Sequence, residues 1–237
     1  MTLPTHKQIE GFLQELADPA IAEHSGRFFT SGKGQYGEGD QFLGIRVPVL
    51  RQQVKAYRGT SLPEIENLLA SQFHEARLFA LFLLVDAFAR ADATSKEEIY
   101  CLYLANTKNI NNWDLVDSSA HQIVGTFLLS RDRSMLLELA NSVSLWERRI
   151  AIVATYHFIR KHQFDDTLKL AEILLGDKED LIHKAVGWML REVGKRDEAV
   201  EKQFLQQHYK KMPRTMLRYA IEKFPNDERK RYLEGTI

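Results

Sequence analysis

Hydrophobic residues recur along the chain at intervals of three and four positions, and no stretch alternates apolar and polar residues as a strand would. This spacing predicts a protein built only of α-helices. The N-terminal helices are expected over 6–16, 19–29 and 48–59, and from Pro63 on with Ser61 as the cap.

Beyond residue 72 the helical pattern becomes periodic. Long apolar helices are expected to begin near Phe73, Asn112, Leu145, Asp180 and Pro213, at intervals of 39, 33, 35 and 33 residues. A shorter amphipathic helix is expected after each one, over 96–107, 132–141, 164–175, 197–211 and 227–234. One helix pair cannot bury its own apolar face, so neighbouring pairs must stack. We therefore predict one all-α domain over 1–237, an α-solenoid of about six to seven HEAT-like helix pairs with a concave binding face.

A glycine-rich stretch at 32–40 interrupts the helices and is expected to be a loop. It contains Gly-x-x-Gly-x-Gly, which resembles a phosphate-binding loop. No strand is predicted before it and no Gly-Lys-Ser/Thr follows it, so the dinucleotide and P-loop interpretations are rejected.

Charge and cysteine content narrow the function classes. The net charge is zero, but residues 1–144 hold 13 basic and 17 acidic side chains, whereas residues 145–237 hold 19 and 15. A polyanionic ligand responds to the local charge of the surface that it meets rather than to the net charge of the whole protein. An ordinary solvated surface explains the charge asymmetry equally well. The single Cys101 excludes a disulfide framework and is expected in the core. With no apolar run near the roughly 18 residues of a membrane span, we expect a cytoplasmic protein, and we expect it to be a monomer.

The segment 111–117 carries the most unusual local chemistry. Asn111 or Asn112 can cap a helix on which Trp113 and Asp117 lie one turn apart on the same face. An aromatic platform beside a carboxylate suits a cationic ligand. The alternative is an ordinary acidic first turn with a packed tryptophan.

One repeat later, Trp146 follows Trp113 by 33 residues and Arg149 follows Asp117 by 32. Arg148 and Arg149 are suited to phosphate, because the guanidinium can donate two bonds at once. An exposed arginine pair beside a core tryptophan is the alternative.

A third tryptophan lies in a basic stripe. Lys184, Trp188, Arg191 and Lys195 step by four, three and four, which places them on one helix face. A buried stripe would not usually carry three charges, so this face is predicted to bind. The alternative is a rim of long side chains around a partly buried indole.

The sequence contains no motif for metal-based or nucleophilic catalysis. The eight histidines do not pair with glutamate at metal-site spacing, and no serine nucleophile elbow occurs. We expect neither a metal nor a cofactor.

Taken together, five segments of this chain resemble the AlkD family of bacterial DNA alkylpurine glycosylases, which are built from HEAT-like repeats. They are FLGIRVPVLR at 42–51, WDLVD at 113–117, WERR at 146–149, KAVGW at 184–188 and LRE at 190–192. The resemblance covers almost the whole chain. It implies a partner, double-stranded DNA containing alkylated purines, and hydrolysis of the N-glycosidic bond of 7-alkylguanine and 3-alkyladenine.

The resemblance also implies site residues. Asp117 matches the catalytic carboxylate, and Trp113 and Trp188 match the aromatics that flank the sugar of the lesion. Arg149 matches a phosphate-binding arginine of the active site, and Arg51 matches a peripheral backbone contact.

Other cations on the predicted concave face, namely Arg148, Lys184, Arg191 and Lys195, are expected to hold the DNA backbone. Two positions depart from the family. Asn112 stands where some members have a second aromatic, and His157 stands where a lysine can contact the backbone.

The implied chemistry fits these residue types. An N7-alkylated purine already carries positive charge, so it leaves without a proton donor. The protein must stabilise an oxocarbenium-like sugar, which the carboxylate of Asp117 and adjacent indole faces can do. The resemblance implies that the lesion is handled at the duplex surface, without a pocket for an extruded base. Two alternatives stay open: a non-catalytic scaffold for DNA or a protein, and a peptide-binding solenoid.

Overall fold

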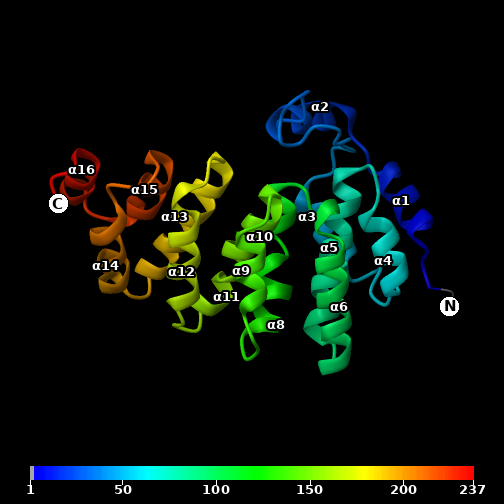
Figure 1. Cartoon of the computed structure of the whole chain (residues 1–237). Helices are drawn as coiled ribbons and strands as arrows, with labels where there is room; N and C mark the ends of the chain where they lie inside the picture. The colour runs from blue at the N-terminus through cyan, green and yellow to red at the C-terminus, as the bar shows by residue number, and fades with distance from the viewer. Residues whose placement is uncertain (1–2) are drawn as a thin grey trace. The chain divides into compact units, whose positions relative to one another are not determined.

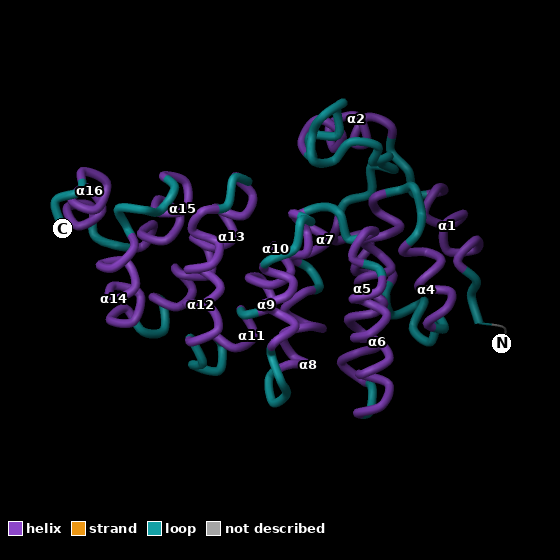
Figure 2. The backbone as a smooth tube through the Cα atoms, viewed as in Figure 1, coloured by secondary structure: helices purple, strands orange, loops and turns teal. Residues whose placement is uncertain are grey.

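The computed structural model describes residues 3–237. Over this range the regular elements are helices, joined by loops and turns, and no strand occurs (Figures 1 and 2). One isolated β-bridge joins Gln41 and Phe73. No helix over this range is long and apolar enough to cross a membrane. The predicted all-α fold class is confirmed. The described chain divides into two compact units with the boundary after Ser119, called unit 1 and unit 2 below. The single domain and the concave face stay predictions.

Unit 1 contains seven α-helices along its described residues. They are α1 (His6–Glu15), α2 (Pro19–Phe28), α3 (Val47–Gln53), α4 (Leu62–Leu69), α5 (His74–Arg90), α6 (Ala93–Ala105) and α7 (Trp113–Asp117). Local sequence fixes several starts. Thr5 and Gln8 form a capping box at α1, and Asp18 accepts from two backbone amides of α2 directly before Pro19.

The core of unit 1 is α5. Every residue from His74 to Leu84 is buried, as expected for a helix that is surrounded on all sides. Helices α3, α4, α6 and α7 pack against α5, and α1 packs against α4 (Figures 1 and 2). Three charged residues at the start of α5, His74, Glu75 and Arg77, therefore enter the interior, where they must find partners.

Glu75 anchors the chain that leads into α3. Its buried carboxylate accepts hydrogen bonds from the backbone amides of Leu43, Gly44 and Ile45, at 2.8 to 3.2 Å. Gly44 has φ +81°, and a Cβ there would lie 2.1 Å from the carbonyl oxygen of Asp18. Only glycine fits this close approach.

Unit 2 begins with a π-helical segment, His121–Gly125, which runs into α8 (Thr126–Leu128). The other helices are α9 (Ser134–Ala140), α10 (Leu145–Ala154), α11 (Tyr156–Ile159), α12 (Asp165–Ile173), α13 (Asp180–Gly194), α14 (Glu198–His208), α15 (Arg214–Ala220) and α16 (Asn226–Glu234). Within this unit α10 packs on α13 and α13 on α15, while α9 packs on α12 (Figure 1). Such layering is that of stacked helix pairs.

The predicted helix starts agree closely with the structure. Helices α5, α7, α10, α13 and α15 all begin within one residue of the expected positions. The long apolar helix expected after Asn112 is wrong, because α7 ends at Asp117 and a turn and the π-helical segment follow. Helix α3 ends at Gln53 rather than near Gly59. The core placement of Cys101 is also wrong: this residue is exposed, because α6 buries Ile99, Tyr100 and Tyr103 instead.

Candidate functional site

The residues selected from the sequence divide between the two units. Unit 1 carries Arg51 on α3 and Trp113 and Asp117 on α7. Unit 2 carries Arg148 and Arg149 on α10, and Lys184, Trp188, Arg191 and Lys195 on α13. Within unit 1, α3 and α7 both pack on α5, and within unit 2, α10 packs on α13. The residues of each unit are described in turn.

Helix α7 presents Trp113 at its first position and Asp117 at its last, one turn further on. Both side chains are half-buried. Burial raises the pKa of the Tyr103 hydroxyl, and the negative charge of Asp117 adds to this effect, so the carboxylate lies within electrostatic reach of α6. The half-buried position leaves Asp117 partly accessible to a ligand.

Asn112 is the helix cap. Its side-chain oxygen accepts from the backbone amide of Trp113 at 2.8 Å, and its amide donates to Asp40 at 3.3 Å. The residue is completely buried. Its burial and its two hydrogen bonds give Asn112 a structural role at the start of α7.

A buried ionic cluster ties α7 to α5. The His74 ring donates from Nε2 to Asp114 at 2.8 Å and from Nδ1 to Asp40 at 3.1 Å. Arg77 donates to the other oxygen of Asp40 at 2.6 Å. Both ring nitrogens face carboxylates, which accept only, so the histidine is an imidazolium.

The charges of this cluster support one another. Burial alone would lower the pKa of His74, but the hydrogen bonds to Asp114 and Asp40 outweigh burial and raise the pKa to about 9. For the acid Asp40, burial alone would raise the pKa instead. The hydrogen bond from His74 and the charge of Arg77 outweigh burial and lower the pKa of Asp40 overall.

Aromatic rings support the indole of Trp113. The Phe29 ring stacks on it at 5.3 Å, and Phe28 meets it edge-on at 5.9 Å. Phe29 also packs on the His74 ring at 4.8 Å and on Phe42 at 5.4 Å. The indole is therefore held from one side by a layer of rings.

Arg51 is exposed on α3, and its guanidinium lies 4.3 Å from the centre of the Phe82 ring. It forms no ion pair with any described residue. This arginine is therefore available to a phosphate.

On α10 the two arginines differ. Arg149 is buried and donates from Nη1 to the carbonyl oxygen of Leu181 at 2.5 Å, which joins α10 to α13. Arg148 donates from Nε to Asp177 at 2.7 Å, and it also donates to the carbonyl of Ser142. Arg148 thus has a clear structural role.

On α13, Trp188 is half-buried and packs on the Tyr156 ring at 6.0 Å. The other neighbours of Tyr156 are His121, edge-on at 5.2 Å, and the guanidinium of Arg196, 5.7 Å from the ring centre. Burial, with the nearby charge of Arg160, lowers the pKa of His121 to about 4, so this ring is neutral. A second indole is thus supported by aromatic packing, as Trp113 is.

The cations of the predicted basic stripe pair with acids. Lys184 pairs with Asp180 at 2.8 Å and Lys195 with Glu192 at 2.5 Å. Arg191 pairs with Glu222. The stripe is therefore closer to the alternative interpretation, a rim of charged side chains around Trp188, than to a row of uncompensated cations.

Sequence reasoning missed His74, Asp40, Asp114 and Arg77. Asp40 and Asp114 lie 34 and 40 positions from His74, so no local pattern joins them. One signal was present: charged residues at the start of a helix that is otherwise continuously apolar.

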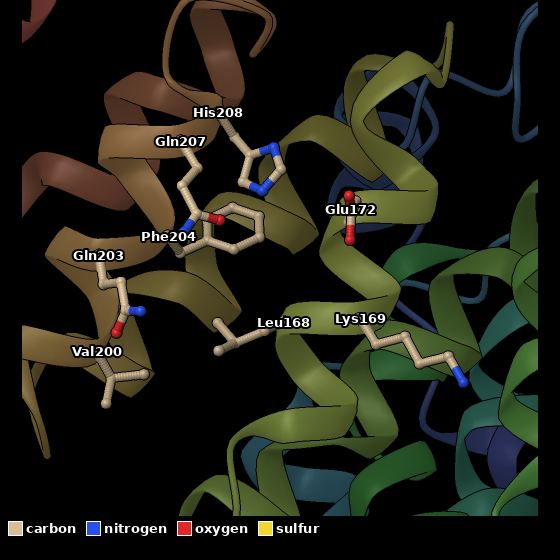
Figure 3. Close-up of a pocket in the computed structure, with 8 residues that line it drawn as sticks. All are labelled: Leu168, Lys169, Glu172, Val200, Gln203, Phe204, Gln207 and His208. Atoms are coloured by element: carbon tan, nitrogen blue, oxygen red, sulfur yellow. The ribbon is translucent and has the colours of Figure 1, made fainter.

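A cavity of unit 2 lies away from the selected residues. Its volume is about 320 Å³, and it lies between α12 and α14, where Phe204 and His208 face Leu168 and the Lys169 ammonium points away (Figure 3). It contains none of the selected residues. Over residues 3–237, no group of three or more His, Cys, Asp or Glu side chains is placed to hold a metal ion.

Comparisons with known proteins support the helical fold and identify the family. The profile of a family described as "DNA alkylation repair enzyme" matches residues 9–224. A structure described as a predicted DNA alkylation repair enzyme from Enterococcus faecalis is similar, with 17% identity and a TM-score of 0.72, over 95% of this chain and 100% of that one.

The structure of smu.31 from Streptococcus mutans UA159 is similar with 16% identity and a TM-score of 0.53, over 87% of this chain and 100% of that one. A search of curated proteins found no match. Because the family profile spans most of the sequence, the chain belongs to the DNA alkylation repair enzyme family.

Proposed function

We propose that the protein is a monofunctional DNA glycosylase that hydrolyses the N-glycosidic bond of cationic alkylated purines, 7-alkylguanine and 3-alkyladenine, in double-stranded DNA. It needs no metal or cofactor, because the alkylated base is already a cationic leaving group. The family assignment supports an enzyme of alkylated-DNA repair.

The observation that carries the proposal is the pairing of Trp113 and Asp117 on one short, firmly held helix. The carboxylate is half-buried one turn after an indole that other rings support. As the glycosidic bond breaks, positive charge develops on the sugar. Asp117 stabilises that charge and orients the attacking water, and the indole of Trp113 adds cation–π attraction.

Unit 2 supplies the remaining proposed roles. Trp188 offers a second supported indole for the lesion sugar. Arg149 binds a phosphate of the DNA, and Arg51 of unit 1 contacts the DNA backbone more peripherally. Backbone contacts of this kind carry no sequence information and weaken with salt.

The test is release of free 7-methylguanine from methylated duplex DNA without heating. We expect the parent protein to release it and Asp117→Asn to lose release by about 100-fold or more while still binding duplex. Asp227→Asn, an exposed acid in the first turn of α16, is the matched control and keeps full activity. Equal release by parent and Asp117→Asn would remove the carboxylate from its role.

One observation favours a second candidate, a non-catalytic scaffold for DNA or a protein. Four of the cations expected to hold the backbone, Arg148, Lys184, Arg191 and Lys195, already pair with carboxylates. A scaffold binds alkylated and unmodified duplex equally and releases no purine, so the same assay separates the two.

A further inference from the structure

His74 lies at the centre of a cluster that joins three segments of unit 1. The ring is 1% exposed, and its two N–H groups bond to Asp114 on α7 and to Asp40 in the loop before α3. Phe29 and Phe42 pack at 4.8 and 4.9 Å from its ring centre. Both ring nitrogens and part of the ring surface are therefore engaged, and the ring cannot turn without breaking one of these contacts.

This cluster decides how α7 is held. A helix of five residues is not stable by itself, so its orientation depends on tertiary contacts. Its cap, Asn112, and its second residue, Asp114, are both tied to the cluster. Trp113 lies between them and stacks on Phe29, which itself packs on the histidine.

We propose that His74 is a positioning residue for alkylpurine excision: its imidazolium holds α7 so that Trp113 and Asp117 meet the lesion sugar in one fixed orientation. This inference rests on the function proposed above. His74 is buried and does not touch DNA; it acts through Asp114.

The charged groups that face the imidazolium account for its response to pH. Asp114 faces it from α7, Asp40 from the loop, and Arg77 from its own helix, whereas Phe29 and Phe42 are neutral. Above pH 9 the ring loses one proton, and a bare ring nitrogen then faces a carboxylate with no hydrogen between them. The hold on α7 weakens at that point.

The first experiment measures the solvent exposure of Trp113 on α7 and does not depend on enzymatic activity. In a Trp146→Phe, Trp188→Phe background, Trp113 is the only tryptophan. We expect its acrylamide quenching to rise between pH 7 and pH 10 with a midpoint near 9. With His74→Gln added, quenching is high throughout and the midpoint disappears. His24→Gln, an exposed histidine of α2 in the same unit, is the matched control and keeps the midpoint.

The second experiment measures single-turnover release of 7-methylguanine in the otherwise native chain. We expect His74→Gln to slow release by about tenfold to a hundredfold, with duplex Kd changed less than about twofold. The rate of the parent falls above pH 9, and the slower rate of the variant does not. His74→Gln combined with Asp114→Asn restores a neutral hydrogen bond, so we expect partial rescue that is independent of pH.

These outcomes separate the two proposals. Trp113 quenching that ignores both pH and His74→Gln overturns the positioning role. The titration of the parent decides this even if the single variant does not fold, since it needs no change at position 74. Quenching that follows His74, with no purine released by any form, overturns the proposed function and leaves the hold of His74 on α7 intact.

Discussion

Asp117 and Arg149 occupy equivalent positions in two different helices: each lies five residues after its N-cap, Asn112 for α7 and Ser144 for α10. The same element of the repeat therefore presents an acid in unit 1 and a base in unit 2. The tryptophans are less regular. Trp113 is the first residue of its helix and Trp146 the second, so the 33-residue spacing does not make them equivalent.

Arg149→Ala should affect both folding and DNA binding. It removes the hydrogen bond to the carbonyl of Leu181 that joins α10 to α13, so we expect stability to fall by about 1–3 kcal/mol. We also expect duplex affinity to drop about tenfold and its salt dependence to become shallower. Urea unfolding and fluorescence anisotropy at several salt concentrations measure these effects. Arg58→Ala, which releases Asp86 and removes a cation outside the predicted site, is the comparison: it leaves the salt slope nearly unchanged.

An unchanged salt slope for Arg149→Ala would count against a phosphate contact.

Asn112→Asp keeps the helix cap but adds a charge. Its carboxylate would lie about where the amide now donates to Asp40 at 3.3 Å, so two buried acids would repel each other. We expect a loss of about 1–3 kcal/mol of stability at pH 7, and less at pH 4, where one of the acids takes up a proton. Asn112→Ser, a cap without charge, separates the two effects in the same unfolding experiment. Equal losses at both pH values would contradict the charge argument.

Glu201 should make unit 2 less stable as the pH rises. It is 2% exposed, and burial with the charge of Glu198 raises its pKa to about 8, against 4.5 for an ordinary glutamate. Between these values the folded state holds a proton that the unfolded state has lost, so unfolding becomes easier with increasing pH. We expect Glu201→Gln to raise stability by about 1–3 kcal/mol at pH 8 and to change it little at pH 4. Urea unfolding at the two pH values checks this.

Exposed Glu172→Gln on α12 should show no such difference. The prediction fails if Glu201→Gln has the same effect at both pH values.

Gly187→Ala should separate α13 from α15. A Cβ at this position would lie 2.4 Å from the carbonyl oxygen of Met216 and 2.5 Å from the Tyr219 Cβ. We expect a lower Tm and a loss of about 1–3 kcal/mol. Gly176→Ala, with no atom within 4 Å of the new Cβ, is the control and leaves Tm unchanged. Thermal unfolding of both variants decides the matter, and an unchanged Tm for Gly187→Ala would contradict the packing.

The helix starts could be predicted because their signals are local. Asn112 and Ser144 each bond to a backbone amide within the next three residues, and Pro213 directly precedes its helix. The cluster of His74 could not be predicted, since its partners come from distant positions and a contact pattern requires the fold. Cys101 shows a different limit: α6 is apolar enough to suggest burial all round, but only some of its positions face the core.

The candidate site shows the same division. Trp113 and Asp117 were selected from their spacing and from the resemblance to a known family, and the structure keeps them on one helix. The ion pairs of Lys184 and Lys195 are three or four residues apart and were readable in principle, but Arg191 pairs with Glu222, 31 positions away.

The π-helical segment at 121–125 has a consequence for comparing sequences. A π-turn accommodates one more residue than an α-turn, so it rotates everything after it by about 100° relative to an uninterrupted helix. In a sequence alignment, a relative that lacks this extra residue is shifted by one position after Ser119 unless a one-position gap is introduced. Without the gap, its residues are paired with residues on a different face of the helix. Placing that gap within 118–125 brings Thr126 and the residues after it back into register with the helices to which they correspond.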